Sequence, residues 1–345
     1  MIQANPKKTL APFVGVVIAA LLLWVWEPDN KKGKSYFENY DLVFGTYYNI
    51  RYEAKRDLQA EINEALKDFD NSLSMFNPHS ILSAINDNRD TTTNEAFESM
   101  WYEAAKVYEI SHGAFDITVA PLVNYWGFGS TKTPNHQEAA NSSDLDEILE
   151  FVGFEKVQLI DHQVIKEDPR IMIDAGAVAK GQACDMIAQV LQEQGCTNYL
   201  VEIGGEVVAH GVNAKGKPWT IGITKPNLNN EGIQEGYQDT LRLTDACLAT
   251  SGNYRNYYYE GTERRSHTID PRTGWPVQHS LLSATVISSS CMQADALATA
   301  CMVLGADDAL DMIANVEGTA CYLIIAENDS LAVLTSPNWD DFTTK

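Results

Sequence analysis

The stretch RIMIDAGAVAKGQACDMIAQVLQEQGCTNYLVEIGGEVVAHG, residues 170–211, decides the fold class. Its first part predicts a strand, then a glycine-containing loop, then a helix. The helix is indicated by apolar residues at helical spacing that would form its buried face, namely Ile187, Val190 and Leu191. Gly195 is placed to end it. The last part predicts β-structure in which Gly204 and Gly205 mark a bulge or a close approach of the backbone.

Helices and hairpins are mixed along the rest of the chain. Apolar residues at helical spacing or ahead of a stop glycine predict helices at residues 58–76, 94–112 and 294–304. Alternating or β-branched segments predict single strands at residues 42–53, 218–225 and 281–290, and hairpins at residues 253–270 and 320–336. A polar surface excursion with a short helix is expected at residues 130–150. The mixture indicates an α+β fold, with mixed, largely antiparallel sheets and packed helices, rather than a doubly wound parallel sheet.

Composition limits the classes of partner. The chain has 345 residues, 45% of them hydrophobic, which is enough for a large core. Its formal net charge is -22. Phosphate backbones are bound by clustered Lys and Arg, so this charge argues against a nucleic-acid-binding protein. Any phosphate site must therefore be local.

We expect the first 35 residues to form a separate segment and residues 36–345 to form the folded domain. An apolar run at residues 10–26 is slightly short for a bilayer core but longer than a usual signal-peptide apolar region. Trp24 and Trp26 suit a membrane interface, and a small-residue cleavage site is missing after the run. We favour one uncleaved N-terminal apolar helix as a membrane anchor over a cleaved signal. The expected location is the inner membrane, with the domain facing the periplasm.

The six cysteines give no metal-binding spacing. They form no CxxC pair and show no zinc spacing with histidine. An exported domain could form disulfides, but Cys301 and Cys321 lie in strongly apolar runs where buried thiols are more common. We therefore predict no particular bridge.

Asp295 and Thr299 are the first candidate site residues. They lie four residues apart in ADALATA, so they share one face of the predicted helix. Their oxygens are hard ligands that suit Mg²⁺. Taken alone, the pair is explained at least as well by an acidic residue near a helix N-terminus and a threonine bonded to the previous turn.

The loop IDAGAVAKG is the second candidate. It places Asp174 and Lys180 around small residues, between the predicted strand and helix. Small residues allow a ligand to approach the backbone, and a lysine at a helix start can meet a phosphate. The loop is neither a Walker A motif nor GxGxxG, so an ordinary connection with an exposed lysine is an equal alternative.

The segment SHTIDPRTGWP, residues 266–276, carries His267, Asp270 and Arg272 together with two prolines and a glycine. We call it the histidine loop. The prolines and the glycine predict a rigid turn, which is neither helix nor central strand. A hydrolase triad of Ser251, His267 and Asp270 is conceivable, but no GxSxG motif supports it.

Eight segments in order resemble the ApbE family of FAD:protein FMN transferases. They are FGTYY, SMFNPHSILSAIN, GAFDITVAPLVNYWGFG, IDAGAVAKGQACD, YLVEIGGEVVAHG, ATSGNYR, HTIDPRTGWP and ADALATACMVLG. The resemblance covers nearly the whole chain beyond the N-terminal segment. Each segment alone is a weak signal, but eight in order make chance similarity improbable.

The resemblance implies a set of site residues. Those implied to contact FAD are Phe44, Phe76, Ala114, Phe115, Asp116, Asp174, Lys180 and Ile269. Those implied to hold Mg²⁺ are the backbone carbonyl of Ala177 and the side chains of Asp295 and Thr299. Phe44 and Phe76 stand where the family commonly has Met and Tyr, so Phe76 can stack on a ligand but offers no hydroxyl. Many family members carry a lipid-anchoring cysteine after the signal, whereas no cysteine precedes Cys184 here.

The implied reaction transfers FMN from FAD to a Thr or Ser hydroxyl of a target protein and releases AMP. We assign His267 as the base or as the group that positions the hydroxyl, because an imidazole titrates near neutral pH. Asp270 and Arg272 are expected to brace the loop. The implied acceptors are subunits of membrane redox complexes. The alternatives are an FAD pyrophosphatase, a non-catalytic FAD-binding protein and a membrane-anchored scaffold.

Overall fold

The computed structural model describes residues 33–129, 141–226, 236–253, 257–260, 263–328 and 330–343. The predicted apolar helix at residues 10–26 lies outside this part of the chain. Within the described residues, no helix has the length and hydropathy of a membrane span.

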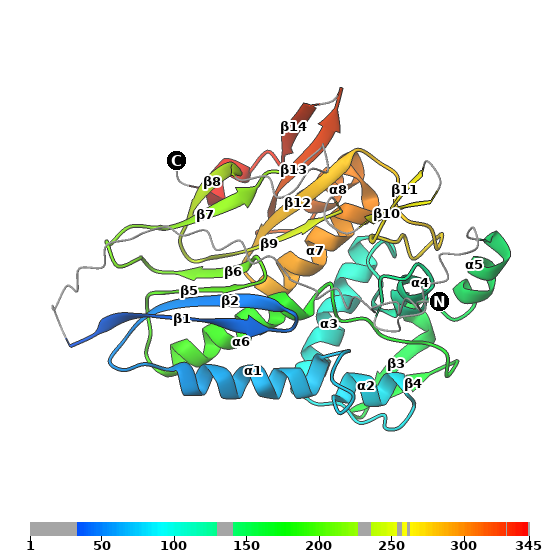
Figure 1. Cartoon of the computed structure of the whole chain (residues 1–345), viewed down its shortest axis with the longest axis horizontal. Helices are drawn as coiled ribbons and strands as arrows, with labels where there is room; N and C mark the ends of the chain where they lie inside the picture. Colours follow the sequence, from blue (N-terminus) through cyan, green and yellow to red (C-terminus); the bar gives the residue numbers. More distant parts are fainter. Residues whose placement is uncertain are drawn as a thin grey trace, which may run out of the picture.

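An eight-stranded sheet is the centre of the fold (Figure 1). Every strand pair in it is antiparallel. In sheet order, the strands are β1 (Ser35–Val43), β2 (Thr46–Ala54), β5 (Tyr199–Ile203), β6 (Glu206–His210), β9 (Ala246–Gly252), β12 (Leu281–Ser288), β13 (Ala320–Glu327) and β14 (Ser330–Thr335). Three two-stranded sheets accompany it: β3 (Val157–Ile160) with β4 (Gln163–Lys166), β7 (Trp219–Thr224) with β8 (Tyr237–Leu243), and β10 (Tyr257–Glu260) with β11 (Glu263–Ser266). The predicted α+β class with largely antiparallel sheets is confirmed.

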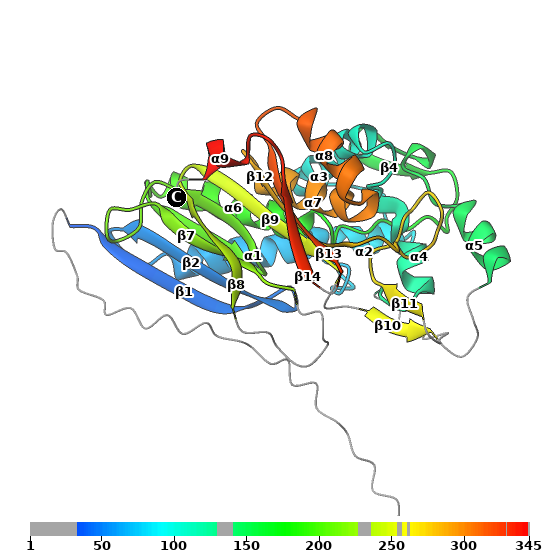
Figure 2. The ribbon, with the colours of Figure 1, turned by 90° about the horizontal axis from the view of Figure 1, so that it is seen from above.

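Helices cover one face of the large sheet (Figures 1 and 2). Those on the sheet are α1 (Gln59–Leu73), α6 (Ala179–Glu193), α7 (Cys291–Leu304) and α8 (Ala306–Ala314), while α2 (Ile81–Asn86) and α3 (Glu95–Ile110) pack against α1 and α7. The opposite face packs against the β7–β8 hairpin and α9 (Trp339–Phe342). A third, smaller cluster joins α4 (Ala120–Tyr125) and α5 (Ser142–Leu149) to the histidine loop. The described part of the chain also contains the 3₁₀ turns η1 (Ile117–Val119) and η2 (Phe154–Lys156).

Burial follows from this layering. Every residue of β12 is buried, because β12 is a central strand with both faces covered. Helix α7 is likewise buried on nearly all sides, between the sheet and the helices around it. Asp295 is a charged residue inside this apolar helix and is only 1% exposed. A carboxylate in that position is costly unless it has partners, so it points to a site.

Three of the predicted elements differ from the structure. Residues 42–53 are not one strand but parts of the β1–β2 hairpin, which turns at Phe44 and Gly45. Gly204 and Gly205 are not a bulge but the turn between β5 and β6, where Ile203 pairs with Glu206. Both glycines have positive φ, which suits a tight hairpin turn.

The third difference is at residues 171–174, which form no strand. The backbone there is bonded to the side chain of Asn86 and to the 3₁₀ turn η1 instead of a neighbouring strand. Ile173 N donates to Asn86 Oδ1 at 2.7 Å, Asn86 Nδ2 donates to Ile173 O at 2.8 Å, and Asp174 N donates to Ile117 O at 2.6 Å. A buried segment that is not a strand can have the same short apolar run as a buried strand. The sequence pattern therefore does not distinguish the two.

The predicted helices are confirmed with small shifts of their ends. Helix α1 ends at Leu73, three residues early, and α7 begins at Cys291, ahead of the predicted start. The stop glycines after α3, α6 and α7 all have positive φ, as a helix C-terminus favours. All six cysteines are free and buried, which confirms the expectation for Cys301 and Cys321.

Candidate functional site

The site is centred where the first turn of α6 crosses α7. The two helices come very close at Gly181, where a Cβ atom would lie 2.2 Å from the carbonyl oxygen of Cys291. Gly181 N does not continue the helical hydrogen-bond pattern but donates to Asp295 Oδ2 at 3.0 Å. The glycine therefore allows α6 to approach α7 and places Lys180 beside Asp295.

Replacing Gly181 by alanine is expected to lower the free energy of unfolding by about 1–3 kcal/mol, because the backbone of α7 must move to accept the methyl group. Urea unfolding measures this. Gln189→Ala, on the exposed side of the same helix, is the matched control and should change stability by less than about 0.5 kcal/mol. A Gly181→Ala variant as stable as the control would show that the crossing is looser than described.

Three charged side chains meet at this crossing. Lys180 Nζ lies 2.8 Å from Glu206 Oε1 and 3.7 Å from Asp295 Oδ1. The two carboxylates are almost fully buried, whereas the lysine side chain keeps 32% of its exposure. Burial lowers the pKa of Lys180, but Asp295 and Glu206 outweigh that effect and raise the pKa overall. Lys180 is therefore an ammonium ion held between two carboxylates.

Glu206 is a member of the site that the sequence analysis missed. It is the first residue of β6, directly after the two turn glycines, and is 2% exposed. Its Oε2 atom is buried and has no hydrogen-bond partner within the described residues. Burial raises the pKa of Glu206, although the ammonium of Lys180 favours its charged form. The only signal in the sequence was a charged residue beginning an otherwise apolar strand.

The predicted metal ligands fit a hard divalent cation. No group of three or more His, Cys, Asp or Glu side chains is placed to hold a metal in the described residues. The predicted set instead combines one carboxylate, one hydroxyl and one carbonyl, from Asp295, Thr299 and Ala177. Since Gly181 N bonds to Asp295, no backbone N–H described here is bonded to the carbonyl oxygen of Ala177. That oxygen is available as a ligand, and all three donors are of the type that Mg²⁺ prefers.

Thr299 lies one turn after Asp295 on the same helix, as predicted. Its Oγ1 is 3.1 Å from the hydroxyl oxygen of Ser251, at the end of β9. Ser251 is thus bonded to the candidate metal ligand, and this is a different role from the nucleophile of a triad. The hydrogen bond between the two hydroxyls joins the C-terminal end of β9 to the candidate metal site.

Asp174 and Asp116 lie on two segments that are bonded to each other. Asp174 Oδ1 accepts a hydrogen bond from Gly176 N at 2.7 Å, which shapes the loop that carries Ala177. Burial raises its pKa. The bond from Asp174 N to Ile117 O places this loop beside η1, whose N-terminal cap is Asp116. The structure therefore brings the GAFD segment next to the lysine loop, although 57 residues separate Asp174 from Ile117 in the chain.

The GAFD side chains are directed into the protein. Ala114 and Phe115 are 1% and 2% exposed. Asp116 accepts hydrogen bonds from Thr118 N and Thr118 Oγ1, both at 2.7 Å, and from Phe154 N at 3.0 Å. Burial raises the pKa of Asp116 to about 6, partly offset by these donors. The predicted contacts of this segment with a nucleotide would thus rely mainly on its backbone.

Phe44 lies in the β1–β2 turn. Its φ is 51°, in the left-handed region that glycine or asparagine usually occupies in such a turn. A bulky residue there costs about 1 kcal/mol or more, and such strain is found at functional positions. Its ring packs against Phe69 of α1, with a centroid distance of 5.5 Å. The positive φ and the packed ring of Phe44 agree with a role in ligand contact. That contact itself stays a prediction.

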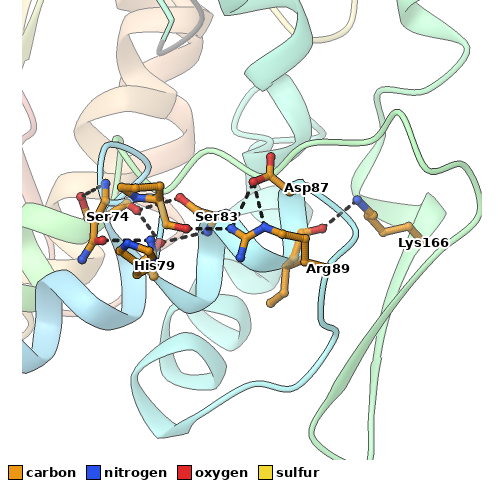
Figure 3. A network of polar contacts seen from close by, with 10 residues as sticks. Ser74, His79, Ser83, Asp87, Arg89 and Lys166 are labelled. Carbon is orange, nitrogen blue, oxygen red and sulfur yellow. Dashed lines mark hydrogen bonds and ion pairs between the residues drawn. The ribbon is translucent and has the colours of Figure 1, made fainter.

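Phe76 lies on the loop between α1 and α2 and is 75% exposed. Hydrogen bonds fix this loop (Figure 3). Ser80 Oγ donates to Ser74 O at 2.6 Å, and Arg89 Nη2 donates to Pro78 O at 2.7 Å. Lys166 Nζ donates to the carbonyl oxygen of Ile85 at 3.0 Å, at the end of α2. An exposed aromatic ring on a firmly bonded loop is a good stacking surface for a planar ligand.

The histidine loop packs onto α4. Trp126 Nε1 donates to Gly274 O at 2.7 Å, and the ring of Phe128 meets His267 edge-on at a centroid distance of 6.2 Å. Ile269 is 5% exposed and belongs to the same apolar cluster as Trp126. His267 itself is half-buried. The imidazole is therefore held on a packed loop while remaining partly open.

Asp270 and Arg272 brace this loop, as predicted. The guanidinium of Arg272 makes two hydrogen bonds to the carboxylate of Asp270, both 2.9 Å long. Asp270 also closes the turn, because its N–H donates to Trp275 O and its carbonyl accepts from Gly274 N. Asp270 is thus occupied by Arg272, and Ser251 by Thr299, so the structure gives no support to a hydrolase triad.

The chain closely resembles proteins of one family. Residues 44–323 match the model of the ApbE family. The FAD:protein FMN transferase of Haemophilus influenzae is 36% identical over 316 residues, which cover 87% of this chain and 90% of that protein. The protein of the same name from Vibrio cholerae is 34% identical, covering 88% of this chain and 91% of its own.

Solved structures agree with these matches. The structure of "Flavin Transferase ApbE from Vibrio cholerae" has a TM-score of 0.79 and 32% identity, and it covers 90% of this chain and 99% of its own. The apo form of the flavinyl transferase ApbE from Pseudomonas stutzeri has a TM-score of 0.80 and 27% identity, with 90% and 97% covered.

Proposed function

The chain belongs to the ApbE family and transfers FMN from FAD to proteins, and we propose that it does so with Mg²⁺, forming a phosphoester to a threonine or serine hydroxyl and releasing AMP. The observation that carries this proposal is the crossing of α6 and α7. There the buried carboxylate of Asp295 lies 3.7 Å from the ammonium of Lys180, the hydroxyl of Thr299 follows one turn later on α7, and the carbonyl of Ala177, just before α6, has no backbone partner among the described residues. Such a set suits a metal and a pyrophosphate together.

In this proposal Ala177, Asp295 and Thr299 hold the metal, and Lys180 lies beside the pyrophosphate of FAD. A bound Mg²⁺ supplies neutralisation of the negative charge on the phosphoryl oxygens. Lys180 adds a second positive charge and can donate hydrogen bonds to the same oxygens. Phe44, Phe76 and the GAFD backbone would contact the rest of the dinucleotide, together with Asp174 and Ile269.

His267 would act on the acceptor hydroxyl. The hydroxyl oxygen forms a new bond to the phosphorus of the FMN half, and the bond from that phosphorus to the bridging oxygen breaks. AMP leaves with the bridging oxygen, and the hydroxyl proton passes to an imidazole nitrogen of His267. The packed histidine loop limits the motion of the ring, which favours a short and repeatable approach to the hydroxyl.

We also propose that the protein is anchored in the inner membrane by residues 10–26, with its domain in the periplasm. The acceptors would then be subunits of membrane redox complexes. Anchoring would raise the local concentration of enzyme near such acceptors. The support for this proposal is the apolar run in the sequence.

The test is to incubate the full chain with FAD, Mg²⁺ and the flavin-carrying domain of such a complex, and to analyse protein and nucleotides by mass spectrometry. We expect the acceptor to gain the mass of one FMN less one water on a Thr or Ser, with an equal amount of AMP released. Omitting Mg²⁺ should abolish both products. Free FMN and AMP with an unmodified acceptor would contradict transfer to that acceptor and favour hydrolysis.

A further inference from the structure

We propose that Glu206 is a positioning residue that holds Lys180 away from Asp295 and so leaves Asp295 for the metal. This inference rests on the proposed function, because it concerns the same metal and nucleotide site. Lys180 Nζ lies between two buried carboxylates, 2.8 Å from Glu206 but 3.7 Å from Asp295. The ammonium is thus hydrogen-bonded to Glu206 and not to the predicted metal ligand.

The side chain of Glu206 does not brace the fold. Asp185, a half-buried carboxylate on α6, shows what bracing requires. Its two oxygens accept hydrogen bonds from the N–H groups of Cys291 and Met292 and from the hydroxyl of Ser290, all at 2.9 Å. Glu206, in contrast, bonds only Lys180 through Oε1, and its Oε2 has no partner within the described residues.

An unpartnered carboxylate oxygen in the interior costs free energy, so a purely structural role does not explain Glu206. The position of its backbone is well fixed. Glu206 pairs with Ile203 across a two-residue turn, and its carbonyl oxygen accepts a hydrogen bond from Cys184 Sγ of α6 at 3.3 Å. The hairpin therefore holds the carboxylate at a fixed distance from Lys180, as a positioning role requires.

The charges explain why a positioning residue is needed. A divalent cation at Asp295 and the ammonium of Lys180 would otherwise compete for one buried carboxylate. With Glu206 present, the crossing has two carboxylates for one ammonium, so one negative charge is left for the metal. Without its charge, Lys180 would turn to Asp295 and exclude the metal. Partners that orient metal ligands typically change metal affinity by about 10–100-fold.

The test measures FAD binding by flavin fluorescence at increasing Mg²⁺, with catalysis prevented by omitting any acceptor and confirmed by the absence of AMP. We expect Glu206→Gln to raise the Mg²⁺ concentration for half-maximal FAD binding at least about tenfold. Adding Lys180→Met to this variant removes the competing ammonium. Because Lys180 is also assigned to the pyrophosphate, this comparison is made by Mg²⁺ calorimetry without FAD. The double variant should bind Mg²⁺ more tightly than Glu206→Gln alone, and this suppression is not expected of a structural defect.

The control is Glu202→Gln. Glu202 lies on the neighbouring strand β5, shares its face with Leu200 in the core on the far side of the sheet, and bonds Tyr47. It should keep the wild-type Mg²⁺ requirement. If Glu206→Gln fails to fold, Glu206→Asp keeps the charge but cannot reach as far, and we expect a several-fold increase.

Two results would overturn the inference: a folded Glu206 variant with the wild-type Mg²⁺ requirement, or no suppression by Lys180→Met. Binding of FAD by the wild-type chain is measured first. If the wild-type chain does not bind FAD with Mg²⁺, the proposed function itself is wrong, together with the inference that rests on it.

Discussion

Replacing His267 by alanine is expected to slow FMN transfer about 100- to 10,000-fold, the range for loss of a general base. The fold should not change, because the histidine loop is held by other residues. Its turn is closed by backbone bonds of Asp270 with Trp275 and Gly274, and it is joined to α4 by Trp126. FAD binding should also stay within about twofold of the wild type, since the imidazole is assigned to the hydroxyl and not to the nucleotide.

The rate is measured by acceptor mass against time, at saturating FAD and Mg²⁺. Added imidazole should restore part of the rate in the His267→Ala variant, because a small base can enter the space left by the ring. His210→Ala is the matched control. That ring stacks on Tyr199 at the end of β6, and its loss should leave transfer unchanged. Transfer at the wild-type rate by His267→Ala would refute the assigned role.

Local patterns were sufficient for much of the fold. The helices were predictable because apolar residues recur at helical spacing and glycines with positive φ end them, as at Gly195 and Gly305. The β10–β11 and β13–β14 hairpins were predictable from strand composition, whereas the β1–β2 hairpin was predicted as one strand and the β5–β6 turn as a bulge. The pattern failed at residues 171–174, where burial produces an apolar run but Asn86 and Ile117 supply the hydrogen bonds. Such partners are distant in the chain, so no local window contains them.

The same limit applies to the site. Asp295 and Thr299 could be paired from the sequence, because four residues separate them on one helix. The bond from Gly181 to Asp295 spans 114 residues, and the pairing of Lys180 with Glu206 spans 26. These pairs depend on how α6, α7 and β6 pack. Glu206 was missed because a glutamate after two glycines is as typical of an exposed turn as of a buried site.

Asp295 is the residue whose charge the site is least able to lose. Replacing it by asparagine keeps the size of the side chain, and the amide oxygen can still accept the hydrogen bond from Gly181 N. The negative charge, however, disappears. Lys180 and Glu206 then remain as a neutral ion pair, so no buried charge is left uncompensated. We therefore expect a folded protein of similar or higher stability.

Asp295 is the only carboxylate in the proposed set of metal ligands. Without its negative charge, FMN transfer by the Asp295→Asn variant should fall at least about 100-fold. FAD binding should no longer increase when Mg²⁺ is added, which flavin fluorescence measures without any reaction. Asp311→Asn, on the exposed side of α8, removes the same charge from the same part of the chain and should behave as wild type.

If Asp295→Asn transferred FMN at the wild-type rate with the wild-type Mg²⁺ requirement, the metal would have to be held elsewhere. The free carbonyl of Ala177 would then need another explanation. Loss of the Mg²⁺ response in a stable Asp295→Asn protein would place the metal at the crossing of α6 and α7.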